Sequence, residues 1–126
     1  MNIPTELKYT KDHEWVRLNG DTITIGITDF AQRELGDIVY VEIDTLEETL
    51  EAEEVFGTVE AVKTVSDLFL PVGGKIIEFN ETLEDSPEKV NEDPYGSGWI
   101  IKLKFDNLSE MESLLDSSTY KDLIGI

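Results

Sequence analysis

Hydrophobic residues recur at every second position through much of this 126-residue chain. Along Trp99–Phe105, for example, one face carries large apolar side chains and the other carries Lys102 and Lys104. Side chains of an extended strand alternate between two faces, whereas those of a helix repeat every 3.6 residues. The period of two therefore predicts a mainly β protein.

Turn signals divide the chain into several short strands. Asn19-Gly20 separates two β-rich runs, and such a pair predicts a hairpin in which both central residues take positive φ. A second tight turn is predicted at Gly73-Gly74. The predicted strands are Trp15–Leu18, Thr22–Ile27, Asp37–Ile43 with Val39, Val41 and Ile43 on one face, the β-rich segments Val55–Val65 and Leu68–Val72, then Lys75–Asn80 and Trp99–Phe105.

Only short helices are predicted, and they flank these strands. Thr28 is the expected N-cap of a short helix that stops at Gly36. Ser86 precedes Pro87 in the manner of an N-cap, and Ser109–Glu112 has capping-box spacing. A last helical turn is expected over Tyr120–Leu123. These elements predict a small β-sandwich or flattened barrel with a C-terminal helix, and residues 1–126 as one domain, with Asp44–Glu54 as an acidic linker.

The charge balance restricts the classes of partner. The chain has 28 acidic and 10 basic residues, a formal net charge of −18. Nucleic acids and anionic membranes would repel this surface, because both are recognised through Lys and Arg. We therefore expect no nucleic acid and no membrane as partner. Basic protein surfaces suit the charge better.

Cysteine is absent and histidine occurs once, as His13. Disulfides, thiolate metal sites and a Cys–His nucleophile are excluded, and no metal site is expected. No apolar run approaches the roughly 18–20 residues that span a bilayer. The first 15 residues resemble neither a signal peptide nor a transit peptide, so a cytoplasmic protein is expected.

Lys63 is the only basic residue between Arg33 and Lys75. Catalytic lysines lose their proton through an apolar pocket or nearby positive charge, whereas Glu60 and Asp67 are acidic neighbours in sequence. Lys63 is thus a poor catalyst, although a modifying enzyme could acylate it. Two interpretations stay open from the residues alone: a solvated hairpin residue that discourages edge association, or a displayed substrate.

Motifs spread over nearly the whole chain carry a family resemblance. They are Lys8–Thr10, His13–Val16, Gly26–Thr28, Ala31-Gln32, Leu35–Val39, Phe56–Glu60, Val62-Lys63, Ser66-Asp67, Leu83–Pro87, Val90-Asn91, Pro94–Gly96, Gly98-Trp99 and Lys102. In this order they resemble the H proteins of the glycine cleavage system.

The resemblance implies a lipoyl/biotinyl-type flattened β-barrel, or barrel-sandwich hybrid, in which Lys63 at a hairpin tip carries lipoate in amide linkage. It implies a carrier and not an enzyme. The arm would take an aminomethyl group from the pyridoxal-phosphate-dependent P protein to the tetrahydrofolate-dependent T protein, and the flavin-dependent L protein would reoxidise it. A lipoate ligase or lipoyltransferase is a further implied partner, and a monomer is expected.

The same resemblance assigns roles to three more residues. Glu14 and Asp67 fall at positions implicated in holding the amine of the loaded arm, and carboxylates suit a cationic amine. Ordinary solvated or capping acids are the alternative for both. His13 is expected to be structural, orienting the chain beside Trp15.

The chain departs from the family at several positions. Asp44 stands where proline is usual, and Glu47 and Glu53 stand where glycine is usual, so these turns need another solution. Ala61 and Gly73 replace common serines, and Ala61 could alter recognition by a ligase. Val62 and Thr64 argue against biotin, whose carriers place methionines beside the lysine.

Other functions compatible with these residues are a lipoyl donor for relay to other enzymes, a lipoate-binding protein of sulfur metabolism, and an unmodified acidic interaction module.

Overall fold

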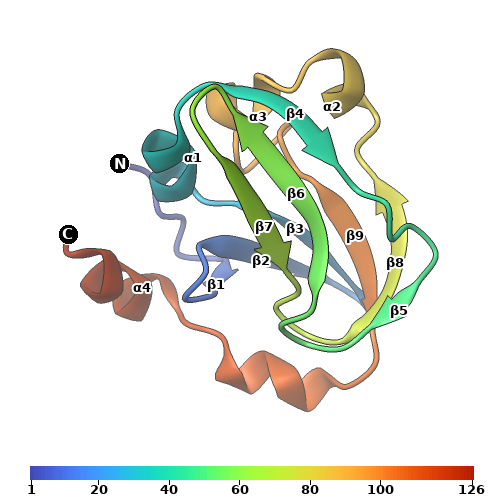
Figure 1. Ribbon diagram of the computed structural model, residues 1–126. Helices are drawn as coiled ribbons and strands as arrows, with labels where there is room; N and C mark the ends of the chain where they lie inside the picture. Colours follow the sequence, from blue (N-terminus) through green and yellow to red (C-terminus); the bar gives the residue numbers. More distant parts are fainter.

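The chain forms two antiparallel β-sheets that face each other across a hydrophobic core (Figure 1). The computed structural model describes all residues, 1–126. The larger sheet has six strands in the order β1-β2-β3-β9-β8-β5, and the smaller has three in the order β4-β6-β7. Neither sheet closes on itself, so the architecture is an open, flattened barrel. The predicted mainly β class is confirmed.

The strands are β1 (Lys8–Tyr9), β2 (Glu14–Asn19), β3 (Thr22–Ile27), β4 (Ile38–Glu42), β5 (Thr49–Leu50), β6 (Val55–Ala61), β7 (Val65–Phe69), β8 (Gly74–Phe79) and β9 (Ile101–Phe105). The helices are α1 (Asp29–Leu35), α2 (Thr82–Asp85), α3 (Lys89–Glu92), the 3-10 helix η1 (Leu108–Ser113) and α4 (Ser117–Ile124). None of these helices has the length and apolar character that crossing a bilayer requires.

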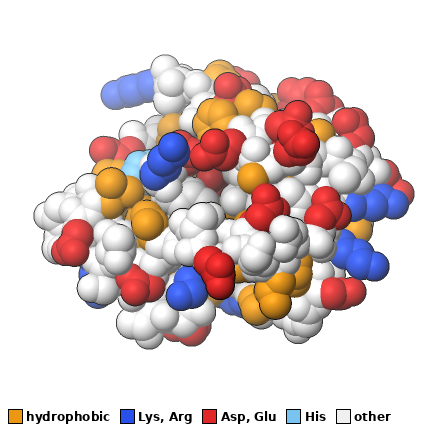
Figure 2. Space-filling model, turned by 90° about the horizontal axis from the view of Figure 1, so that it is seen from below, with side chains coloured by type: hydrophobic (Ala, Val, Ile, Leu, Met, Phe, Trp, Pro, Cys, Tyr) orange, Lys and Arg blue, Asp and Glu red, His pale blue; other side chains and the backbone are white.

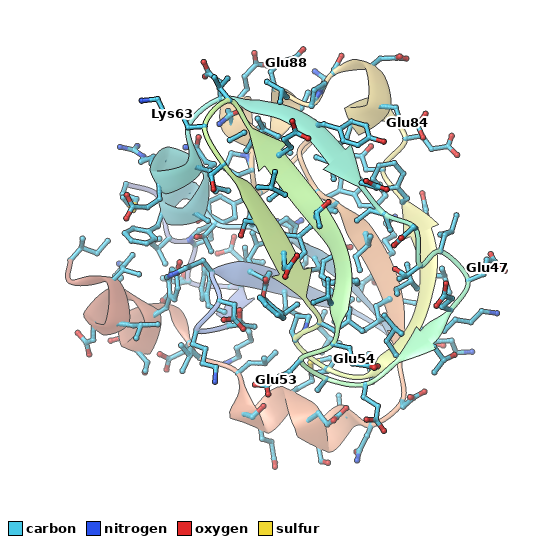
Figure 3. The ribbon with its side chains drawn as sticks, viewed as in Figure 1. Glu47, Glu53, Glu54, Lys63, Glu84 and Glu88 are labelled. Carbon is cyan, nitrogen blue, oxygen red and sulfur yellow. The ribbon has the colours of Figure 1, made fainter.

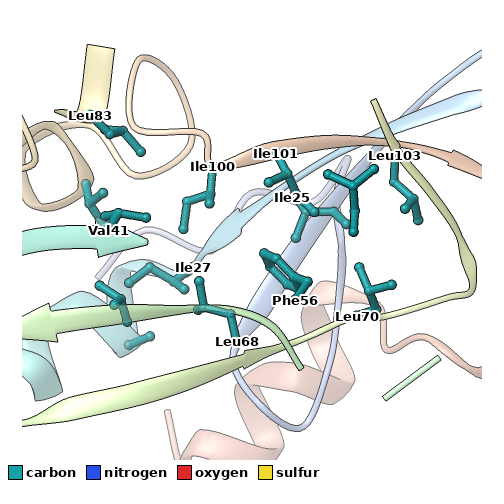
Figure 4. Close-up of a cluster of buried hydrophobic side chains, with 14 of the residues drawn as sticks. Ile25, Ile27, Val41, Phe56, Leu68, Leu70, Leu83, Ile100, Ile101 and Leu103 are labelled. Carbon is teal, nitrogen blue, oxygen red and sulfur yellow. The ribbon is translucent and has the colours of Figure 1, made fainter. Parts of the chain in front are cut away.

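Two hydrophobic clusters hold the sheets and helices together. The main cluster contains 19 buried residues, and Phe56 of β6 lies among aliphatic side chains of both sheets (Figure 4). A second cluster joins the N-terminal segment to α4: Ile3, Leu7, Tyr9, Trp15 and Tyr120. Each fully buried aliphatic side chain contributes about 1.5–3 kcal/mol, whereas exposed ion pairs contribute at most about 1 kcal/mol. All four ion pairs have an exposed partner, so the clusters dominate stability.

The hairpin between β2 and β3 is present, but its turn lies one residue later than predicted. Asn19 pairs with Thr22, which leaves Gly20 and Asp21 as the turn residues. Gly20 has a φ of 67°, and Asn19 is not among the residues with positive φ. The prediction of positive φ at both Asn19 and Gly20 is therefore wrong, because glycine alone supplies the left-handed conformation.

Strand β4 lies within the predicted range, but Val39 does not face the core together with Val41 as predicted. The register against β6 shifts between Ile38 and Tyr40. Val41 stays in the core, whereas Val39 is 47% exposed. An irregularity in a ladder changes which side chains face inward, and alternation in the sequence does not reveal it.

The pair Gly73-Gly74 is not a tight turn. Neither residue has positive φ, and Gly74 is the first residue of β8, opposite Phe105 of β9. A Cβ atom on Gly74 would collide with the carbonyl oxygen of Lys104. Glycine is needed here because two strands approach closely, which is the second common use of this residue.

The first helix follows its sequence signals closely. Thr28 is the N-cap of α1 and its side chain accepts a hydrogen bond from the backbone N–H of Ala31. The helix ends at Leu35, and Gly36 is its C-cap. Both predicted ends are confirmed.

The other helix signals were less accurate. Ser86 is the C-cap of α2, and α3 begins only at Lys89. The side chain of Asn107, outside the proposed capping box, accepts a hydrogen bond from the N–H of Ser109 at the start of η1. The last helix is longer than the predicted turn, because Asp116 caps it and extends it over Ser117–Ile124.

Residues 44–54 contain the short strand β5 and two glutamates in the left-handed region. Glu47 has a φ of 75° and Glu53 has a φ of 71°. These are two positions where the family usually has glycine, so the chain keeps glycine-like backbone conformations with side chains that disfavour them. The left-handed conformation costs a residue with a Cβ atom roughly 1–2 kcal/mol.

Glu47→Gly is expected to raise the free energy of unfolding by about 0.5–1 kcal/mol, because relief of the left-handed strain exceeds the added freedom of the unfolded chain. Glu48→Gly is the matched control. Glu48 is also exposed, carries the same charge and lacks positive φ, so that change should be destabilising. Urea titration of both variants measures the difference. Equal effects of the two changes would refute the strain at Glu47.

Candidate functional site

Lys63 lies in the short turn between β6 and β7, at one end of the molecule (Figure 3). The turn is closed by the N–H of Ala61, which donates to the carbonyl of Thr64 at 2.8 Å. The N–H of Val62 donates to the carbonyl of Asp37 at 3.2 Å. The backbone of the turn is thus tied on two sides, while the Lys63 side chain is exposed and has no ion pair. Display at a hairpin tip is confirmed.

The charges around Lys63 are mixed. A surface hollow beside the lysine is lined by Arg33, Glu34 and Asp37. Glu53 and Glu54, which precede β6 in sequence, lie at the opposite end of that strand (Figure 3). A seven-residue strand separates these glutamates from the turn, whereas α1 brings Arg33 to it.

Glu14 is the first residue of β2 and its side chain is only 2% exposed. The hydroxyl of Thr10 donates to Oε1 at 2.8 Å. The backbone N–H of Phe69 donates to Oε2 at 3.2 Å. Because Phe69 ends β7, an edge strand of the three-stranded sheet, Glu14 connects the two sheets at this point.

Burial raises the pKa of Glu14 to about 8, and the charge of Asp12 adds to this shift. The hydrogen bonds from Thr10 and Phe69 act in the opposite direction. A carboxyl group with this pKa is mostly protonated at neutral pH, and a cation that approaches it favours the ionised form. Glu14 can therefore become a carboxylate when a cationic group binds beside it.

Asp67 lies on β7, is exposed, and lines the same cleft as Glu14. The cleft has a volume of about 230 Å³ and runs between β7, α1 and the residues before β2. Its walls combine acids with apolar side chains: Asp12, His13, Glu14, Ile27, Phe30, Ala31, Glu34, Leu35, Val59, Ser66, Asp67 and Leu68.

The cleft adjoins the hollow beside Lys63. Glu34 and Leu35 at the end of α1 line both cavities. The hollow beside Lys63 and the cleft lined by Glu14 and Asp67 therefore share one wall. The three residues singled out in the sequence are thus brought to one side of the molecule, on two adjoining cavities.

Several lining residues carried no signal in the sequence analysis. Phe30 and Glu34 lie one helical turn apart on α1, so the amphipathic pattern of that helix could have identified them. Ser66 belongs to one of the family motifs and also lines the cleft. His13 packs against Phe30, with ring centroids 4.9 Å apart, and also faces the cleft. The structural role expected for His13 beside Trp15 stays a prediction.

The acidic character of the surface is visible as well. In Figure 2, acidic side chains are spread across the face shown, with fewer basic ones between them. This distribution matches the formal net charge of −18 and gives no extended basic patch on that face.

Comparisons with known proteins agree with this geometry. A model of the glycine cleavage H-protein family matches residues 7–125. The glycine cleavage system H proteins of Bacteroides fragilis and Bacteroides thetaiotaomicron are 58% and 59% identical over 125 residues, covering 99% of each chain. A crystal structure of a glycine cleavage system H protein from Mycobacterium marinum superposes with a TM-score of 0.90 at 38% identity, covering 98% of this chain and all of that one.

The fold, the cleft beside an exposed hairpin lysine, and full-length identity above 50% all lead to the same family. The chain belongs to the glycine cleavage H-protein family, the lipoyl carriers of the glycine cleavage system.

Proposed function

We propose that Lys63 carries lipoate in amide linkage on its Nζ atom. Three properties of the residue support this: an exposed side chain, a turn tied by two backbone hydrogen bonds, and a hollow that leads away from it. Val62 and Val65 beside it are 70% and 60% exposed, which offers a lipoate ligase or lipoyltransferase an apolar surface around the lysine. The observation that carries the proposal is that the hollow beside Lys63 and the cleft of Glu14 share Glu34 and Leu35 as lining residues.

A bound lipoyl group would supply a dithiolane that accepts the aminomethyl group derived from glycine. Glu14 would bind the cationic amine of this cargo in the cleft through a charge-assisted hydrogen bond. Asp67 would add negative charge at the cleft entrance, where solvent screens it. The apolar walls formed by Ile27, Phe30 and Leu68 would keep water away from the carbon between sulfur and nitrogen.

The protein acts as a non-catalytic carrier in this proposal. Its partners are the P protein, which loads the arm, the T protein, which unloads it, and the L protein, which reoxidises it. The acidic surface favours partners with basic docking faces, and these associations should weaken as salt rises. A cytoplasmic monomer remains part of the proposal.

Residues 1–126 are proposed to act as one lipoyl-binding domain. The two hydrophobic clusters support this, because neighbouring residues of β2 serve both of them. Trp15 belongs to the second cluster and Val16 to the main one. Separating the clusters would require breaking this strand out of its sheet.

Lipoylation and loading can be tested in sequence on the full chain. Treatment with a lipoate ligase, lipoate and ATP should add the mass of one lipoyl amide, and peptide mapping should locate it on Lys63. The lipoylated protein, with its arm in the oxidised disulfide form, should then take up an aminomethyl group from glycine with the P protein, because the electron pair left by decarboxylation reduces the disulfide. It should release that group with the T protein and tetrahydrofolate.

Each step has its own negative result. An unchanged mass with a ligase that modifies another H protein would refute lipoylation of this chain. Full lipoylation without glycine-dependent loading would leave a lipoyl protein outside glycine cleavage, as in the relay and sulfur-metabolism alternatives.

A further inference from the structure

A chain of hydrogen bonds connects the C-terminal helix to the cleft. The Tyr120 hydroxyl of α4 lies 2.8 Å from Nδ1 of His13 and 2.8 Å from Oγ1 of Thr28. Thr28 is the N-cap of α1, and its Oγ1 accepts the N–H of Ala31 at 3.1 Å. Tyr120 is fully buried, so its hydroxyl must find its partners within this chain.

The direction in which these hydroxyls donate decides which nitrogen of His13 carries the proton. Thr28 Oγ1 already accepts a hydrogen bond from the N–H of Ala31. The Tyr120 oxygen is the side-chain atom to which the Thr28 hydroxyl can donate its hydrogen. If Thr28 donates to Tyr120, then Tyr120 donates to Nδ1 of His13. A hydroxyl donor at Nδ1 requires that nitrogen to be unprotonated, which leaves the hydrogen of neutral imidazole on Nε2.

The ring of His13 lines the cleft, and histidine atoms reach the surface in Figure 2. No buried side-chain nitrogen lacks a hydrogen-bond partner, so Nε2, which has none in the protein, is open to solvent. The backbone is held in a left-handed conformation with φ 69°: the His13 N–H donates to the Thr10 carbonyl, and the His13 carbonyl accepts the N–H of Thr28. Such conformations cluster at functional sites.

The charge of His13 matters because of what surrounds it. Asp12 next to it, Glu14 on β2, Glu34 on α1 and Asp67 on β7 line the same cleft. Burial lowers the pKa of His13, although Asp12 and Glu34 favour its charged form. A hydrogen bond donated to Nδ1 also disfavours protonation of the ring.

We propose that Tyr120 is a positioning residue that, with Thr28, holds His13 as the neutral Nε2–H tautomer, so that the arm cleft presents a hydrogen-bond donor without a positive charge. This inference rests on the proposed function in that the cleft receives a cationic aminomethyl group. A charged imidazolium would repel that cation, whereas a neutral ring leaves the carboxylates of the cleft to attract it.

Nitrogen-15 NMR of the unmodified protein tests the tautomer directly. The chain has one histidine, so one imidazole is observed. We expect the Nε2–H tautomer at pH 7.5 in the wild type. In Tyr120→Phe we expect both tautomers and a titration midpoint of His13 at higher pH, because the donor at Nδ1 is lost.

Tyr9→Phe is the matched control. Tyr9 stacks on Tyr120 with ring centroids 4.8 Å apart, and its hydroxyl donates to the carbonyl of Pro4 instead of His13. This variant loses a buried hydroxyl from the same cluster and should keep the wild-type tautomer. If Tyr120→Phe unfolds, the comparison of Thr28→Ser with Thr28→Val takes its place. Serine keeps the hydroxyl that hydrogen-bonds to Tyr120, and valine removes it.

The consequence for the arm is measured on lipoylated, aminomethyl-loaded protein at pH 6.5. Tyr120→Phe should lose the aminomethyl group about fivefold faster than wild type, because a larger share of His13 is then charged and repels the cationic amine, and Tyr9→Phe should not. An Nδ1–H tautomer in the wild type, or no change of tautomer in Tyr120→Phe, would overturn the assignment. A changed tautomer with unchanged retention would overturn the role toward the arm. Because the NMR uses unmodified protein, failure of lipoylation is a separate result.

Discussion

Lys63→Arg is expected to abolish lipoylation and glycine-dependent loading while the fold is kept. Arginine keeps the positive charge but its guanidinium is not acylated by a ligase. The side chain is exposed and has no ion pair, so the free energy of unfolding should stay within about 0.5 kcal/mol of wild type. Intact mass after ligase treatment measures lipoylation, and a urea titration measures the free energy of unfolding.

Lys75→Arg is the control for this substitution. Lys75 lies on β8 and is also exposed, so the change has the same chemistry away from the turn. That variant should be lipoylated to the wild-type extent. Residual lipoylation of Lys63→Arg would mean that another amine is the attachment site, and its unfolding would mean that Lys63 is needed for the turn.

Glu14→Gln is expected to release the loaded aminomethyl group about 10- to 100-fold faster than wild type. The glutamine can accept a hydrogen bond but cannot become a carboxylate, and a charge-assisted hydrogen bond is worth about 1.5–3 kcal/mol. The release of formaldehyde and ammonia from loaded protein, followed without the T protein, gives the rate. Asp67→Asn, at an exposed position, should change it only a few-fold because solvent screens that charge. Equal rates for wild type and Glu14→Gln would exclude Glu14 from amine binding.

The same substitution should remove a pH dependence of stability. The unfolded chain releases the Glu14 proton near pH 4.5, whereas the folded protein holds it to about pH 8. Between these values the folded state binds more protons, so the free energy of unfolding falls as pH rises. Relative to Glu14→Gln, the wild type should lose on the order of 4 kcal/mol between pH 5 and pH 9.

Urea titrations of the two proteins at a series of pH values measure this difference. Both chains share all other acidic residues, so their common self-repulsion cancels in the comparison. A constant difference across the series would show that Glu14 is ionised in the folded protein. The contribution of Glu14 to stability would then come only from the hydrogen bonds that it accepts from Thr10 and Phe69.

Local signals predicted local structure well. The cap at Thr28 and the stop at Gly36 bound α1 as expected, because capping depends on residues within one turn of the helix. Local sequence signals failed where a residue's conformation or burial depends on a strand that is distant in the sequence. Gly74 is glycine because of the backbone at Lys104 on another strand, and Val39 is exposed because of the register of β4 against β6.

The candidate site divides in the same way. By itself the sequence determined that the chain is mainly β and that Lys63 lies in a turn between two strands, since alternation and turn residues act over a few positions. Family motifs added Glu14 and Asp67. Only the tertiary structure decided that the amide of Phe69, 55 positions from Glu14, buries that carboxyl beside the cleft. It also placed Tyr120 on His13, 107 positions away. These contacts arise from the packing of two sheets and a terminal helix, and the energy that forms them is spread over the whole core, so no short segment encodes them.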